Sequence, residues 1–122
     1  MGTYIVLVNS TDKGAVNVRE VPNRQQTSRD TAAKLGIVRK TVYMTLGPYD
    51  FVQIIEAPND EAVAKYVLSI NSKGNVRTTT MRAWDEAAHF EFIKAMPART
   101  RLQVGRLPLD CGVEVEAVGY VP

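Results

Sequence analysis

The stretch Thr41–Pro58, TVYMTLGPYDFVQIIEAP, holds two strand-like runs on either side of a Gly47-Pro48 corner. The run before the corner, residues 37–46, alternates between an apolar and a semi-polar face, as expected of a strand near the edge of a sheet. The run after it, residues 50–57, is apolar on both faces, which is typical of a central strand covered on both sides. This stretch therefore predicts an edge strand and a central strand that meet at a tight corner.

The segments on either side complete a βαββαβ order. Residues 3–10, TYIVLVNS, are apolar on both faces and predict a second central strand. Residues 12–35 are typical of a helix with a break or restart at Pro22, and a second helix with one apolar stripe is predicted to open at residues 58–60. Residues 75–83, NVRTTTMRA, predict another edge strand. This order, with the first and third strands central, is that of a ferredoxin-like α+β sandwich.

The C-terminal part of the chain departs from this order. A third helix is predicted over residues 85–96, and Pro97 ends it. Further on, residues 112–118, GVEVEAV, alternate between apolar and acidic side chains, as half-exposed strands do. We therefore expect two parts: a ferredoxin-like domain over residues 1–96, and an extension over residues 97–122 that serves as an edge strand or an oligomer contact.

The composition is that of an ordinary globular domain. A chain of 122 residues with 45% apolar content can bury a core of its own. Fifteen Lys and Arg against thirteen Asp and Glu leave a net charge of +2, and the basic residues form no run, so no nucleic-acid partner is indicated. No apolar stretch approaches the ~18 residues of a membrane span. The lone Cys111 is typical of a reducing compartment. We expect a cytoplasmic protein with neither a membrane nor a nucleic-acid partner.

Two helices inserted between the strands would cover one face of the sheet and leave the other bare. The side chains expected on that bare face are Thr41, Tyr43, Thr45, Phe51, Gln53 and Ile55. Because large exposed apolar patches mark interfaces or binding sites, we expect a second copy of the chain to pair with this face, as a homodimer or larger homo-oligomer. Space between the paired sheets would bind a small organic molecule through Thr41, Tyr43, Thr45 and Gln53. Interface packing is the alternative role for Tyr43.

Three blocks of the sequence, TYIVLVNSTDKG, TLGPYDFVQIIEAPNDEAV and SKGNVRTTTMRAW, together resemble the GYD domain family. The name residues of the family would be Gly47, Tyr49 and Asp50, and the resemblance covers roughly residues 3–95. It implies a dimeric α+β barrel, a superfamily that includes cofactor-free monooxygenases, isomerases, haem enzymes and effector-binding regulatory domains. Because such a fold hosts many chemistries, the resemblance implies no single activity.

The catalytic candidates are Tyr49, Asp50 and His89. Asp50 would act as a base, with Tyr49 as a hydrogen-bond donor at a pocket mouth. Alternatively, Asp50 accepts backbone N–H bonds across the corner and is structural. His89, the single histidine, would be a general base or a ligand, or else a half-buried histidine beside an apolar helix face. No Cys/His set with metal-ligand spacing is present in the sequence, and we expect no cofactor.

Two functions from different classes follow from these features. The first is a homo-oligomeric α+β barrel that binds a small organic molecule between paired sheets and, if it is an enzyme, performs cofactor-free proton or oxygen chemistry. The second is a non-catalytic oligomerisation or effector-sensing module. The sequence leaves the choice between them open.

Overall fold

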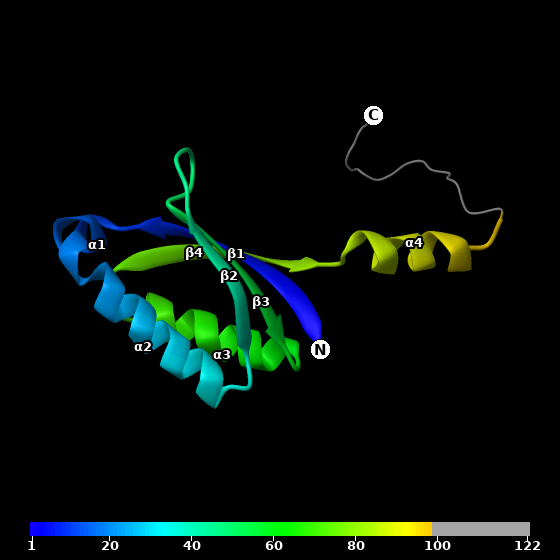
Figure 1. The fold of residues 1–122 in the computed structure, drawn as a ribbon, viewed down its shortest axis with the longest axis horizontal. Coiled ribbons are helices and arrows are strands. Elements are labelled where there is room, and N and C mark those ends of the chain that lie inside the picture. The colour runs from blue at the N-terminus through cyan, green and yellow to red at the C-terminus, as the bar shows by residue number, and fades with distance from the viewer. Residues whose placement is uncertain (99–122) are drawn as a thin grey trace. The chain divides into compact units, whose positions relative to one another are not determined.

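Residues 1–98 are described by the computed structural model of the protein, drawn in Figure 1. The elements, in chain order, are β1 (Gly2–Ser10), α1 (Asp12–Val16), the 3₁₀ helix η1 (Val18–Glu20), α2 (Val21–Lys34), β2 (Val38–Met44), β3 (Phe51–Ala57), α3 (Asp60–Asn71), β4 (Val76–Ala83) and α4 (Glu86–Ala95). The strands lie in the order β2-β3-β1-β4, and every neighbouring pair is antiparallel. The predicted ferredoxin-like α+β fold, with its first and third strands central, is confirmed.

The chain forms two compact units, and the boundary between them follows Trp84. The first unit, residues 1–84, contains the whole sheet with α1, α2 and α3. In the second unit the structure describes α4, whose predicted position is confirmed and whose first turn is capped by Asp85. None of the residues of α4 is buried. The strand predicted over residues 112–118, and with it the role predicted for the extension, lies outside the described residues.

The core lies between the sheet and two helices. Figure 1 shows α2 and α3 on the same face of the sheet. The strand side chains buried beneath them are Tyr4, Val6 and Val8 of β1 and Gln53, Ile55 and Ala57 of β3. The helices contribute Ala32 of α2 and Ala62, Val63, Tyr66 and Ile70 of α3. The spacings of three and four within α3 place its apolar residues in one stripe, and that stripe packs onto the central strands.

Local sequence signals fix where the helices begin. The side-chain oxygens of Thr11 and Asn59 each accept a hydrogen bond from the backbone N–H three residues on, at 3.2 and 2.8 Å. These contacts satisfy backbone donors that the first turns of α1 and α3 would otherwise leave open. Pro22 lies in the first turn of α2, directly after η1, where its missing N–H costs no helical hydrogen bond. The predicted helix break at Pro22 thus corresponds to a change from 3₁₀ to α geometry.

Candidate functional site

Asp50 joins the Gly47-Pro48 corner to β1 by donating one hydrogen bond and accepting another. The backbone N–H of Asp50 donates to Val8 O at 2.9 Å, and the Asp50 carboxylate accepts the backbone N–H of Ser10 at 2.8 Å. The Thr45 hydroxyl donates to Tyr49 O at 2.6 Å, and this contact closes the corner itself. The described contacts of Asp50 and Thr45 are therefore those of structural residues, which supports the structural alternative for Asp50.

Replacing Asp50 with alanine is expected to lower the free energy of unfolding by about 1–2 kcal/mol, because the Ser10 N–H loses a charged acceptor. Urea denaturation followed by circular dichroism measures the loss. The matched control is Asp50→Asn, whose side-chain oxygen can still accept from Ser10 and which should lose less than half as much. Equal stability of wild type and Asp50→Ala would show that the carboxylate is free for another role.

A face of the sheet is left without a helix in residues 1–84. Side chains paired directly across neighbouring antiparallel strands lie on the same face. By this rule the centre of the face turned away from α2 and α3 carries Ile5, Leu7, Thr41, Tyr43, Val52, Ile54, Thr79 and Met81, two side chains from each strand. The two ends of the same face carry Thr3, Asn9, Val38, Glu56, Arg77 and Ala83. We call the eight central residues the open face. None of them is buried, and Tyr43 is 59% exposed.

The predicted ligand-binding residues separate onto different sides of the sheet. Thr41 and Tyr43 belong to the open face, as expected. The placement of Gln53 on that face is wrong, because Gln53 is buried on the helix side and its Oε1 accepts the Tyr66 hydroxyl at 2.8 Å. Phe51 and Ile55, which share its parity along β3, lie on the helix side as well. Thr45 follows the last residue of β2, and its hydroxyl is used within the corner.

Burial of the Tyr66 side chain has an electrostatic consequence. Desolvation raises the pKa of the Tyr66 phenol above its ordinary value, because the phenolate would lose its hydration under α3. The nearby Arg39 and the hydrogen bond to Gln53 oppose this shift. The Tyr66–Gln53 pair is therefore a neutral, satisfied polar contact inside an apolar core, and it stabilises the core without supplying an acid or a base.

A second polar cluster lies at the other end of β1. The hydroxyl of Tyr4 donates to the Asp60 carboxylate, and this hydrogen bond, together with burial, raises the pKa of Tyr4. The guanidinium of Arg82 lies 5.2 Å from the centre of the Tyr4 ring and 4.7 Å from that of Trp84, within the range of cation–π contacts. No motif in the sequence pointed to this stacked arrangement of Arg82.

His89 lies on α4, in the second unit, and is not brought together with Tyr49 and Asp50 by anything the structure describes. Its side chain is exposed, which corrects the expectation of a half-buried histidine. Its ring packs edge-to-face with Phe90 at 4.7 Å, and its Nδ1 lies 3.3 Å from Asp85 O. Within residues 1–98, no three His, Cys, Asp or Glu side chains are grouped so that they could hold a metal ion.

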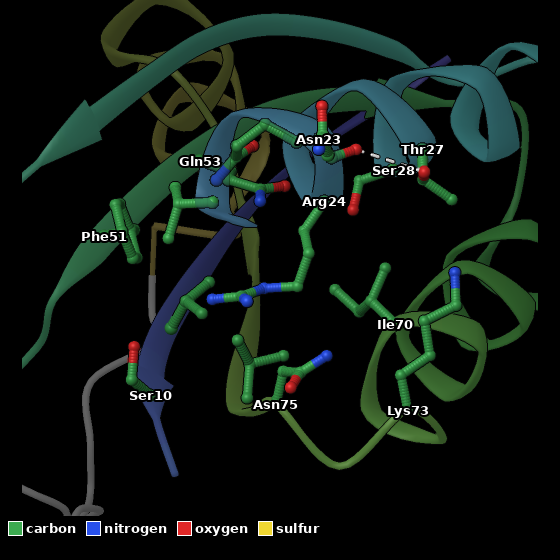
Figure 2. A pocket seen from close by; sticks show the side chains of 14 residues that line it. Ser10, Asn23, Arg24, Thr27, Ser28, Phe51, Gln53, Ile70, Lys73 and Asn75 are labelled. Atoms are coloured by element: carbon green, nitrogen blue, oxygen red, sulfur yellow. Dashed lines mark hydrogen bonds between the residues drawn. The ribbon is translucent and has the colours of Figure 1, made fainter. Parts of the chain in front are cut away.

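A pocket of about 170 Å³ opens between the sheet and the start of α2. Figure 2 shows Arg24 reaching from α2 into this pocket, with Ile70 of α3 and Lys73 of the loop after α3 also in its lining. Its apolar lining is Val8, Val21, Phe51, Ile70 and Val76. Sequence reasoning did not find this site, because its lining comes from β1, α2, β3, α3 and the start of β4, and no motif links those segments.

Comparison with known protein families gives a match over most of the chain. Residues 4–96 match the GYD domain family. The chain belongs to the GYD domain family. This GYD protein is also 37% identical over 84 residues to a Thermus thermophilus protein named glutamine synthetase and cystathionine beta-lyase binding protein, covering 68% of the chain and 88% of that relative. The family resemblance predicted from the three sequence blocks is thereby confirmed.

Solved structures support the fold of the GYD protein. The crystal structure of MtbAldR from Mycobacterium tuberculosis superposes with a TM-score of 0.56 at 19% identity. The match covers 70% of this chain and 52% of the other, so the GYD protein spans about half the length of MtbAldR. At this identity the likeness establishes the shared fold. Within residues 1–98, no helix has the length and apolar character needed to cross a membrane.

Proposed function

We propose that this GYD protein is a non-catalytic binding module that works as a homodimer, with the open faces of two copies packed against each other. The observation that carries the proposal is the composition of the open face: six of its side chains, Ile5, Leu7, Tyr43, Val52, Ile54 and Met81, are apolar or aromatic, and none is buried. Contiguous apolar surface of this kind marks an interface. A two-fold axis lets the same patch cover itself.

Two further observations support binding over catalysis. The carboxylate of Asp50, the proposed base, accepts a backbone N–H and thereby holds the corner to β1. The Thermus thermophilus relative carries a name that describes binding to two enzymes. We infer that this chain acts in the same general way, through contacts with an enzyme of nitrogen or sulfur amino-acid metabolism. Isothermal titration calorimetry against purified glutamine synthetase and cystathionine beta-lyase tests that part of the proposal. The absence of a measurable heat of binding with both enzymes would contradict it.

The dimer is tested by placing a charge on the open face. Wild type is expected to sediment at twice the 13.5 kDa of one chain at micromolar concentration. Leu7→Lys should sediment as a single chain, because two lysines would be desolvated at the centre of the interface. Analytical ultracentrifugation measures both masses, and circular dichroism verifies that the variant is folded.

The matched control for this test is Leu68→Lys, which makes the same substitution on α3 at a side chain that is 69% exposed and lies away from the open face. This control should keep the mass of the wild type. A wild-type protein that sediments as one chain at micromolar concentration, or a dimer that survives Leu7→Lys, would overturn the proposed pairing.

A small-molecule site between the paired sheets is the second candidate function, and Tyr43 is the observation that favours it. Its hydroxyl belongs to a side chain that is 59% exposed on the open face, where it can meet either a second copy or a ligand. Thr41 lies on the same face and adds a second hydroxyl. Gln53 lies on the helix side and the Thr45 hydroxyl is used within the corner, so two of the four proposed ligand-binding side chains remain, which is a sparse polar lining for a ligand pocket.

A further inference from the structure

The geometry points to a binding site for a small organic carboxylate in the pocket beneath α2. This site lies on the helix side of the sheet, whereas the proposed dimer uses the open face, so the inference goes beyond the proposed function and does not depend on it. The pocket has about 170 Å³ of space, close to the cavity of roughly 150 Å³ that admits benzene in another protein. Its occupant is therefore a compact molecule.

The charged side chains that line the pocket favour an anionic ligand. Arg24 and Lys73 are both lining residues, and no Asp or Glu is among the lining side chains. Neither cation forms an ion pair with another described residue. Val21 and Asn23 of the first turn of α2 also line the pocket. An anionic group would meet two cations within one small volume.

Arg24 is held in place before any ligand arrives. Its Nη1 donates to Asn17 O at 2.9 Å and its Nη2 to Gly14 O at 3.4 Å, both in the segment before α2. These contacts leave further N–H donors of the guanidinium for an anion, and they reduce the entropy lost when it binds. The ammonium of Lys73 makes no hydrogen bond to another described residue and can turn toward the same anion.

The uncharged side chains that line the pocket favour a ligand with an apolar part next to its anionic group. Val8, Phe51, Ile70 and Val76 give the pocket an apolar side that a hydrated inorganic ion would not use. The side-chain Oδ1 of Asn75 is buried and has no hydrogen-bond partner among the described residues. A buried acceptor without a donor is costly, so an O–H or N–H on the same ligand would be favoured there. A carboxylate with a short apolar body, with or without a hydroxyl, matches all of these features.

The test is a titration of the full-length protein with acetate, butyrate, 2-hydroxybutyrate and benzoate, each compared with its uncharged amide. Two-dimensional ¹H–¹⁵N NMR follows the backbone amides. We expect at least one carboxylate to bind more tightly than its amide by about ten-fold or more, as for a hydrogen bond to a charged group. The shifts should centre on Val8, Phe51, Ile70 and Val76.

The charge is tested with Lys73→Gln, because removing Arg24 would also release the segment before α2. This variant should weaken binding of the tightest carboxylate by about ten-fold. The matched control is Lys34→Gln, which removes the same charge from the last turn of α2, where the residue does not line the pocket. Lys34→Gln should bind as wild type does. The inference is overturned if no carboxylate binds at millimolar concentration, if the amides bind equally well, or if Lys73→Gln has no effect. Failure of the dimer test would leave these outcomes unchanged.

Discussion

Replacing Tyr66 with alanine is expected to lower the free energy of unfolding by about 3–5 kcal/mol, the usual cost of removing a large aromatic side chain from a core. Tyr66 is completely buried, and it packs from α3 against the central strands. Alanine would leave a cavity that its neighbours can only partly fill. Because small domains have about 5–15 kcal/mol of stability in all, this loss takes a large share of it. Urea denaturation at neutral pH measures the change.

Two further variants separate the ring of Tyr66 from its hydroxyl. Tyr66→Phe keeps the ring but leaves the Gln53 amide oxygen without its donor, which should cost about 1–3 kcal/mol. Adding Gln53→Leu to Tyr66→Phe removes both partners and should recover most of that loss, since a polar pair replaced by apolar groups of similar shape is nearly neutral. If Tyr66→Ala were no less stable than Tyr66→Phe, α3 would not be packed on the sheet as described.

Alternation in the sequence was sufficient to predict the sheet, but not the orientation of every strand. The edge strand β2 alternates between polar and apolar side chains, so its Thr41 and Tyr43 could be placed on one face from the pattern. The run over residues 50–57 is apolar on both faces and carries no such signal. The face of Gln53 was therefore assigned wrongly. Its position is set by Tyr66, a contact between α3 and β3 that spacing along the chain does not reveal.

The pocket beneath α2 could not be predicted for a related reason. Arg24, Lys73 and Asn75 are ordinary surface residue types, and they stand in segments that show no binding motif. They come together because α2 and α3 lie on the same face of the sheet and because the loop before β4 returns beside α1. The sequence predicted each of these elements. Only the tertiary arrangement shows that two unpaired cations share one small apolar space.

Replacing Gly14 with alanine is expected to destabilise the protein by about 1–3 kcal/mol, although alanine normally stabilises a helix relative to glycine by about 1 kcal/mol. Gly14 lies in α1, and an added Cβ would stand 2.1 Å from the backbone oxygen of Asn75. That oxygen also accepts the backbone N–H of Thr11 at 3.0 Å, so it cannot move away without loss of the bond that joins α1 to the start of β4. The clash is with backbone, which no side-chain rotation relieves.

Gly2→Ala is the matched control for this substitution, because its added Cβ would also be crowded, at 2.8 Å from Cζ of Arg82. There the obstacle is the end of the Arg82 side chain. It can rotate away only by leaving the Tyr4 and Trp84 rings and the carbonyl oxygens of Thr3 and Ala83, and these exposed contacts should cost less to give up than a contact between backbone atoms. Thermal denaturation should therefore show a clear drop in melting temperature for Gly14→Ala and a smaller drop for Gly2→Ala. Asn75 lines the pocket beneath α2. Displacing its backbone should therefore also weaken the affinity of the Gly14→Ala variant for carboxylates. An unchanged or higher melting temperature for Gly14→Ala would mean that α1 and the start of β4 are not in contact.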